Sequence, residues 1–354
     1  MNKSMYFYIV NIHEKYMMRC IQLAKNGLGT TYPNPLVGSV VVYKDKIIGE
    51  GWHKQSGKSH AEVNAIDSVK NQKLLTKATI YVNLEPCIHF GKTPPCANLI
   101  IEKGIKNVVI GSKDPNPKVS GKGIALLKEN GCNVIQGVLK NDCNDLNKRF
   151  FTFFGKKRPY IILKWAETQD GFISPKFKTK KKPVWITNKN SRQLVHQWRS
   201  QEQAILVGTK TILKDNPCLT TRDWFGSSPI RIVIDKKLKI PFDATIFDCS
   251  NKTIIVTEIE KKNKFNLSYN LIDFSKNTTH QICDLLYKHK VQSLIVEGGT
   301  KTLQTFISHN LWDEARIFKG TPLFNEGTKA PSIKGQKVSE IKIGKDILKI
   351  LLND

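Results

Sequence analysis

Long hydrophobic runs are absent from this sequence of 354 residues. The longest apolar runs, such as Ile205–Gly208 and Leu294–Val296 with their neighbours, are far shorter than the roughly 20 residues that a membrane span needs. The apolar stretch Met5–Val10 is too short for the core of a signal peptide, and no small-residue cleavage site follows it. We therefore expect no membrane association and a cytoplasmic protein.

Cysteines and acidic residues are both scarce. Eight cysteines without regular spacing do not form the pattern of a disulfide scaffold. The 30 acidic residues stand against 56 Lys and Arg, which gives a net charge of +26 that could neutralise nucleic-acid phosphates. However, lysine is spread along the whole chain, and no basic run alternates with aromatic residues as a single-strand-binding surface requires. The densest cluster, Lys178–Lys182, is typical of a solvated loop, so we expect no nucleic-acid partner.

The length favours two domains, and apolar periodicity predicts alternating strands and helices in both. The polar, proline-terminated segment 155–159 marks the linker, which predicts domains at 1–156 and 157–354. The alternation predicts α/β folds with largely parallel sheets, and we find no internal repeat. In the first domain we expect strands at 36–43, 47–50, 79–84, 107–112 and 133–137, and helices at 17–24, 61–69, 97–103 and 123–130. In the second we expect strands at 160–166, 204–208, 230–235, 253–257, 293–297 and 314–318, and helices at 190–201, 280–288 and 301–309.

A set of metal-ligand residue types marks the first domain. His60 and Glu62 open a helix, Cys87 follows a strand in Glu85-Pro86-Cys87, and Cys96 precedes the next helix. One imidazole and two thiolates fill three corners of a zinc tetrahedron and leave the fourth for water, whose pKa zinc lowers to about 7. Glu62 is a poor ligand candidate but well placed to carry protons. This H-x-E…P-C pattern is the signature of zinc deaminases, and it predicts hydrolytic deamination with one Zn²⁺ per chain.

Two alternatives remain for these residues. Cys87 and Cys96 could be buried thiols, or ligands of a closed structural zinc site in a protein that is not an enzyme. A closed site needs a fourth protein ligand, and His89, on the loop between the cysteines, could provide it.

The cysteine spacing is also informative. Eight residues separate Cys87 from Cys96, and the segment ends in Gly91-Lys-Thr-Pro-Pro-Cys96. From about His13 to about Ile317 the chain resembles the bifunctional riboflavin-biosynthesis pyrimidine deaminase/reductase family. The resemblance implies a cytidine-deaminase-like α/β/α sandwich followed by a dihydrofolate-reductase-like α/β domain. It also implies a small-molecule substrate, 2,5-diamino-6-ribosylamino-4(3H)-pyrimidinone 5′-phosphate, and we expect a homo-oligomer. The implied deaminase contacts to this substrate are Asn34, His53, Lys92, Asp114 and Asn116. For each of these residues, ordinary turn chemistry is the competing interpretation.

The second domain matches landmarks of the family's reductase in order, from Asp170-Gly171 through Trp185-Ile186-Thr187 to Glu297-Gly298-Gly299. The resemblance implies that NADPH delivers hydride to C1 of the opened ribose, which gives 5-amino-6-(5-phosphoribitylamino)uracil. Backbone N–H groups after Gly299 could bind the cofactor pyrophosphate, and arginine side chains could grip the substrate phosphate. The implied cofactor contacts are Ala166, Trp185, Thr211, Asp215, Gly299, Thr300, Lys301 and Thr302. The implied substrate contacts are Arg199, Leu219, Arg222 and Glu297.

Three departures from the family pattern concern the reductase. Glu167-Thr168-Gln169 stands where Ala-Ser-Leu is usual, Pro183 replaces a serine, and Lys236 replaces a small polar residue. They leave open a deaminase with a weakened reductase domain. A further alternative is a nucleic-acid base deaminase with a C-terminal binding module. The eight-residue cysteine spacing and the ordered matches from Trp185 to Arg222 argue against that alternative.

Overall fold

The computed structural model describes residues 11–88, 95–179 and 181–353. The chain divides into two compact units, residues 1–156 and 157–354, and each is described here by itself. None of the helices in the described residues is long and apolar enough to cross a membrane.

The first unit is built on a five-stranded sheet in the order β2-β1-β3-β4-β5. Its strands are β1 (Gly38–Tyr43), β2 (Lys46–Trp52), β3 (Thr79–Leu84), β4 (Asn107–Ser112) and β5 (Asn133–Gln136). Its helices are α1 (Ile12–Lys25), α2 (Ala61–Asp67), η1 (Gln72–Lys77), α3 (Cys96–Glu102), α4 (Lys122–Glu129), α5 (Lys140–Leu146) and α6 (Lys148–Lys156).

This sheet is mixed, so the prediction of a largely parallel sheet is wrong here. Strands β3, β4 and β5 run parallel, but β1 pairs antiparallel with both β2 and β3. The reason is the tight hairpin between β1 and β2, where Lys44 and Asp45 both have positive φ, 46° and 59°. Two consecutive residues of this conformation form the short turn that joins antiparallel strands.

Successive side chains of β1 belong to two separate hydrophobic clusters, one on each face of the sheet. Val41 packs with α2 and α3 through Ala65, Ile66 and Ala97. The neighbouring Val40 instead packs with α1 through Met17, Cys20 and their neighbours. Because successive side chains of a strand point to opposite faces, helices cover both sides of the sheet. The predicted α/β/α sandwich is confirmed.

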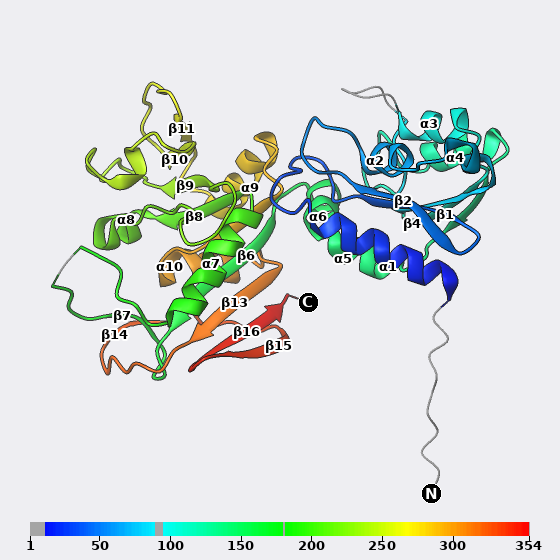
Figure 1. The fold of residues 1–354 in the computed structure, drawn as a ribbon. Helices are drawn as coiled ribbons and strands as arrows, with labels where there is room; N and C mark the ends of the chain where they lie inside the picture. Colours follow the sequence, from blue (N-terminus) through cyan, green and yellow to red (C-terminus); the bar gives the residue numbers. More distant parts are fainter. Residues whose placement is uncertain (1–10, 89–94, 180, 354) are drawn as a thin grey trace, which may run out of the picture. The chain divides into compact units, whose positions relative to one another are not determined.

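The second unit is built on a nine-stranded sheet in the order β11-β10-β9-β8-β12-β6-β13-β16-β15 (Figure 1). From β11 to β13 all neighbours are parallel, and β16 and β15 add an antiparallel edge. The strands are β6 (Tyr160–Glu167), β8 (Ala204–Gly208), β9 (Ile230–Ile234), β10 (Thr253–Thr257), β11 (Leu267–Leu271), β12 (Ser293–Val296), β13 (Glu314–Lys319), β15 (Gln336–Ile343) and β16 (Asp346–Leu352). A separate two-stranded ribbon joins β7 (Phe172–Pro175) to β14 (Gly327–Lys329).

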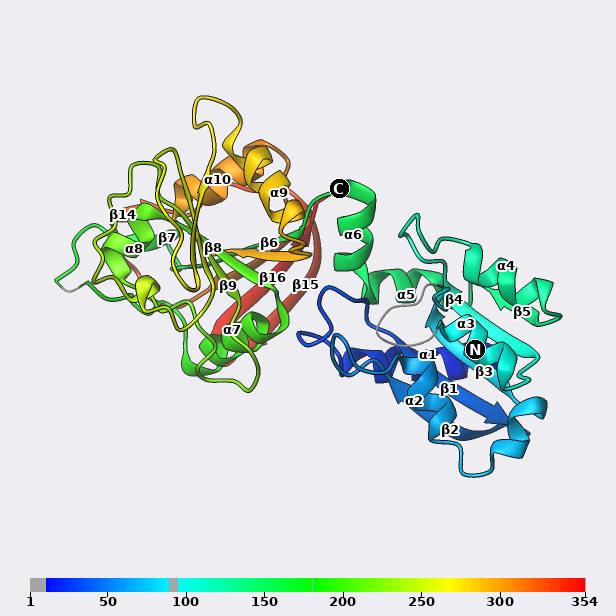
Figure 2. The ribbon, with the colours of Figure 1, turned by 90° about the horizontal axis from the view of Figure 1, so that it is seen from above.

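Helices cover both faces of the large sheet (Figure 2). They are α7 (Lys189–Gln201), α8 (Thr209–Asp215), α9 (Thr278–Lys288) and α10 (Thr300–Ser308), with the short η2 (Thr245–Phe247). Ile282 and Phe306 place α9 and α10 on one side of the sheet, in one core cluster. Val195, Trp198 and Ile212 place α7 and α8 in the other cluster. The expected dihydrofolate-reductase-like α/β domain is confirmed.

Candidate functional site

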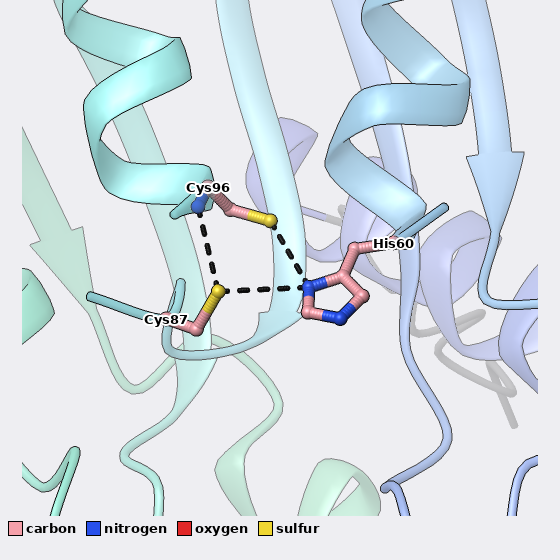
Figure 3. Close-up of side chains that lie close together, drawn as sticks. All are labelled: His60, Cys87 and Cys96. Atoms are coloured by element: carbon pink, nitrogen blue, oxygen red, sulfur yellow. Dashed lines mark hydrogen bonds between the residues drawn. The ribbon is translucent and has the colours of Figure 1, made fainter. Parts of the chain in front are cut away.

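The predicted metal-ligand residues of the first unit meet at the starts of two helices (Figure 3). His60 is the N-cap of α2, Cys96 is the first residue of α3, and Cys87 follows β3. His60 Nδ1 lies 3.3 Å from Cys96 Sγ and 3.5 Å from Cys87 Sγ, and the three donor atoms lie within 4.8 Å of one another. A tetrahedral zinc ion with Zn–S of about 2.3 Å and Zn–N of about 2.0 Å requires N···S separations of about 3.5 Å. The donor set therefore fits zinc in both chemistry and spacing.

The electrostatics around these donors also suit a cation. The pKa of the Cys87 thiol is lowered, because Cys96 and His60 hydrogen-bond to its sulfur. The backbone N–H of Cys96 also donates to Cys87 Sγ, at 3.4 Å. A thiolate is the form of cysteine that binds metal.

Glu62 lies in the first turn of α2 and is only 3% exposed. Burial is the main cause that raises the pKa of its carboxyl to about 7, and the nearby Cys87 adds to the rise. A carboxyl that titrates near neutrality can both accept and release a proton under physiological conditions.

Two of the predicted deaminase substrate residues lie together beside the metal ligands. Asn34 Nδ2 lies 3.0 Å from His53 Nε2, and His53 Nδ1 lies 3.1 Å from the Ser59 carbonyl oxygen. The His53 ring packs edge-on against His60, with centroids 5.3 Å apart. Since the carbonyl can only accept, Nδ1 carries the proton and Nε2 accepts from the Asn34 amide. Burial lowers the pKa of His53, which favours this neutral form.

The other predicted deaminase contacts occupy a turn. Asp114 Oδ1 accepts the Asn116 N–H at 2.7 Å, and Asn116 Oδ1 accepts the Lys118 N–H at 3.1 Å. Burial, with contributions from Glu85 and Cys87, raises the pKa of Asp114 to about 6. Lys92 and His89 lie outside the described residues.

The sequence analysis missed the side chain that holds the turn at Asp114 and the start of α4. Buried Glu85 accepts four backbone N–H groups, from Asp114, Gly121, Gly123 and Ile124, at 2.9 to 3.2 Å. The only sequence signal was its place in the Glu-Pro-Cys motif, two residues before a ligand.

Two buried asparagines hold the loop that carries Asn34, and the sequence analysis missed them as well. Asn147 accepts the Leu36 N–H at 2.8 Å and donates to the Leu36 carbonyl at 2.9 Å. Asn83 donates to the same carbonyl and accepts the Gly38 N–H. Leu36 is two residues beyond Asn34, so both asparagines fix the segment that presents Asn34. Nothing in the sequence links Asn147 to a residue 111 positions earlier.

A buried ion cluster marks the second unit. Arg199, on α7, donates to both carboxylate oxygens of Glu297, from Nε at 3.3 Å and from Nη2 at 2.8 Å. Lys164, on β6, places its Nζ 3.8 Å from the same carboxylate. Burial alone would raise the pKa of Glu297, but Arg199 and Lys164 together lower it to about 2. Arg199, which we predicted as a phosphate ligand, thus donates to a carboxylate within the unit, and Lys164 is a neighbour of Glu297 that the sequence analysis did not single out.

The remaining predicted substrate residues lie on the segment after α8. The Arg222 N–H donates to His196 Nδ1 at 3.1 Å, and the exposed Arg222 side chain donates to Thr220 Oγ1 at 3.3 Å. Burial and the charges of Arg199 and Arg222 lower the pKa of His196 to about 4, so its ring is a neutral acceptor. Leu219 is buried in the core, which leaves its main chain as the part that can reach a ligand.

Four of the eight predicted cofactor residues gather where β12 leads into α10. The Gly299 N–H donates to Thr211 Oγ1 at 3.1 Å, and a side chain on Gly298 would lie 2.9 Å from Thr302 Cβ. The turn therefore leaves no room for a side chain at Gly298. Thr300 begins α10 and donates its hydroxyl to the Lys329 carbonyl. Four of the predicted cofactor residues are thus brought together: Thr211, Gly299, Thr300 and Thr302.

The other predicted cofactor residues lie in different surroundings. Asp215 ends α8 and pairs with Lys178. Trp185 is 57% exposed, and the Arg192 guanidinium lies 4.4 Å from its ring centroid. Ala166 is a half-buried residue of β6 that packs against the core, and Lys301 is exposed in the first turn of α10.

Comparison with known proteins gives consistent results for both units. Residues 10–112 match the cytidine and deoxycytidylate deaminase zinc-binding region, and residues 159–343 match the RibD C-terminal domain. The riboflavin biosynthesis protein RibD of Aquifex aeolicus is 38% identical over 337 residues, which cover 94% of this chain and 93% of that protein. RibD of Actinobacillus pleuropneumoniae is 39% identical over 355 residues, with 94% and 93% covered.

A solved structure is similar over nearly the whole chain. It is the diaminohydroxyphosphoribosylaminopyrimidine deaminase/5-amino-6-(5-phosphoribosylamino)uracil reductase of Thermotoga maritima, at 38% identity with a TM-score of 0.88. The similarity covers 97% of this chain and 99% of the Thermotoga chain.

Proposed function

Since the chain belongs to the RibD family of bifunctional riboflavin biosynthesis enzymes, we propose that its two units act in turn on one pyrimidine ribotide. The zinc-dependent unit removes an amino group from 2,5-diamino-6-ribosylamino-4(3H)-pyrimidinone 5′-phosphate. The second unit reduces the resulting 5-amino-6-(5-phosphoribosylamino)uracil with NADPH. Assignment of the second unit to the family's reductase replaces the alternative of a nucleic-acid-binding module, and the match of the first unit to a deaminase zinc-binding region replaces that of a structural zinc protein.

We propose that His60, Cys87 and Cys96 bind the zinc ion, and the convergence of these three donor atoms is the observation that carries the deaminase assignment. When bound, zinc would supply a water acidic enough to attack carbon near neutral pH. Glu62 is the residue that would carry a proton from the attacking water to the departing amino group, which leaves as ammonia. The carboxyl is suited to this because burial raises its pKa to about 7.

Substrate orientation in the deaminase falls to the Asn34–His53 pair. Neutral His53 accepts a hydrogen bond from the Asn34 amide NH2, which orients the amide so that its oxygen can accept from a substrate amino group. Asp114, Asn116 and Lys92 complete the proposed contacts. Lys92, as the ammonium of the Gly91-Lys-Thr-Pro-Pro sequence, suits the phosphate.

In the reductase, NADPH would supply the hydride that saturates C1 of the opened ribose. Ionised Glu297 accepts hydrogen bonds from ribose hydroxyls, and Arg199 holds it in place with two hydrogen bonds. Lys164 is the ammonium next to this carboxylate, and burial lowers its pKa, which favours proton donation to the ribose ring oxygen as the ring opens. Arg222 stays exposed and is the better candidate for the substrate phosphate.

The test is to give the purified protein the diaminopyrimidinone ribotide with and without NADPH, and to follow ammonia, NADPH and product mass. Without NADPH the product should carry oxygen in place of one amino group, and with NADPH it should gain two further hydrogens. Glu62→Gln should abolish ammonia release while reduction of the deaminated ribotide continues. The matched control is Glu102→Gln, at the exposed end of α3. Normal ammonia release by Glu62→Gln would refute the proton-carrier role.

The homo-oligomeric state and the cytoplasmic location remain proposals. A chain that consumes NADPH and a phosphorylated intermediate needs access to both pools, which supports the cytoplasm. Sedimentation equilibrium of the full chain tests the oligomer, and a single species with the mass of one chain would refute it.

A further inference from the structure

Two contacts connect the β7–β14 ribbon, and the segment that follows β7, to the proposed cofactor site. On one side, Thr300 at the start of α10 donates its hydroxyl to the carbonyl of Lys329 on β14. On the other side, Lys178, three residues beyond β7, forms an ion pair with Asp215 at the end of α8. Figures 1 and 2 show the segment after β7 passing beside α8. These two contacts therefore place the ribbon and the segment after β7 against α10 and α8, which carry proposed cofactor contacts.

The Lys178 contact lies on the functional face of α8. Thr211 and Asp215 are four residues apart on this helix, so their side chains share one face. Thr211 in turn accepts the Gly299 N–H at the turn where we place the pyrophosphate. Lys178 thus contacts the same face of α8 that, through Thr211, contacts the turn before α10.

Burial separates this ion pair from ordinary surface pairs. The Lys178 and Asp215 side chains are 15% and 26% exposed, whereas Lys176 and Glu326 of the same ribbon are 56% and 66% exposed. Exposed pairs contribute little because water and salt screen them, and partly buried charges interact more strongly. A partner for the Asp215 carboxylate is also needed chemically, because a lone carboxylate repels the cofactor phosphates.

We propose that Lys178 is a positioning residue of the NADPH site, which holds the Asp215 carboxylate in place and balances its charge against the cofactor phosphates. The inference rests on the proposed reductase function. The ion pair engages Oδ1 of Asp215, and a carboxylate offers about four acceptor positions, so hydroxyl groups of a cofactor ribose can still be accepted. With Lys178 beside it, the Asp215 carboxylate can bind a ribose hydroxyl without repelling the phosphates of the same cofactor.

The experiment measures NADPH binding directly, by titrating the full chain and following NADPH fluorescence without substrate. Lys178→Ala should raise the Kd for NADPH about tenfold, equivalent to about 1.4 kcal/mol. Lys178→Arg, which keeps the charge, should recover most of the affinity. Lys176→Ala is the matched control from the same ribbon, and it should bind NADPH like the wild type. Ammonia release and thermal unfolding of each variant report that the chain is folded.

A double-mutant cycle tests whether Lys178 acts through Asp215. If it does, Lys178→Ala adds little to the loss caused by Asp215→Asn, because the charge to be balanced is already gone. Fully additive losses would overturn the positioning role. If Lys178→Ala binds NADPH as tightly as the wild type, the inference fails alone and the reductase assignment stands. If the wild type binds no NADPH, the proposed reductase function itself fails.

Discussion

Glu297 is the carboxylate on which two cations of the second unit converge, so Glu297→Gln is the most direct perturbation of the reductase cluster. Arg199 donates to both of its oxygens, and Lys164 Nζ lies 3.8 Å away. These charges overcome the effect of burial and lower its pKa from 4.5 to about 2. The glutamine side chain keeps the shape of glutamate and removes only the charge.

The magnitude and the sign of the effect follow from that difference in pKa. Lowering the pKa of Glu297 from 4.5 to about 2 corresponds to about 3 kcal/mol. Because the pKa is lower in the folded state, ionised Glu297 stabilises the fold above pH 4.5, and this contribution is lost as the pH falls toward 2. At pH 7 the variant should lose about 3 kcal/mol in free energy of unfolding relative to the wild type. At pH 3 the loss should shrink to roughly 1 kcal/mol.

Urea unfolding followed by tryptophan fluorescence measures this loss in the full chain. Five of the six tryptophans lie in the second unit and report on it: Trp165, Trp185, Trp198, Trp224 and Trp312. The matched control is Glu326→Gln, which breaks an exposed pair and should change stability by at most about 1 kcal/mol. Both variants should still release ammonia. An equal loss at pH 3 and pH 7, or none at pH 7, would refute the assignment of this stability to charge.

Three further predictions concern the first unit. Cys96→Ala should abolish zinc binding and ammonia release and spare the reduction of 5-amino-6-(5-phosphoribosylamino)uracil, as metal analysis and the two assays would show; retained zinc would contradict it. Glu85→Ala removes the acceptor of four backbone N–H groups and should destabilise the unit by about 3 kcal/mol, with faster hydrogen exchange at the start of α4. Asn147→Ala removes the acceptor of the Leu36 N–H and one of the two donors to the Leu36 carbonyl, so it should raise the deaminase KM more than it lowers kcat; steady-state ammonia release measures both, and an unchanged KM would oppose it.

The zinc donors could be predicted from the sequence because each lies in a short motif at the end of a regular element. His60 and Cys96 stand at helix starts and Cys87 follows a strand, so the local pattern already indicated which residues could converge. The long-range partners had no such signal. Arg199 and Lys164 lie on two separate elements and Glu297 follows a third, and only the packing of the sheet brings the three side chains together.

Four of the elements that the sequence analysis missed have a weak apolar pattern. Strand β15 is mostly exposed along its length, so it lacks the buried alternation that predicts a strand. Helix α5 reads Lys-Asn-Asp-Cys-Asn-Asp-Leu, and Asn and Asp are poor helix formers, so tertiary packing decides its conformation. Strands β7 and β14 are too short to show the alternation of apolar and polar residues that predicts a strand.

The missed segment at the end of the first unit bears on function as well as on the fold. Asn147 lies between α5 and α6 and holds both main-chain groups of Leu36, so the last part of the unit fixes the loop that carries Asn34. A deaminase shortened before α5 would keep all three zinc donors but lose this support. Metal binding and substrate binding should therefore separate in such a chain, which places substrate orientation, and not zinc affinity, under the control of residues beyond the zinc motif.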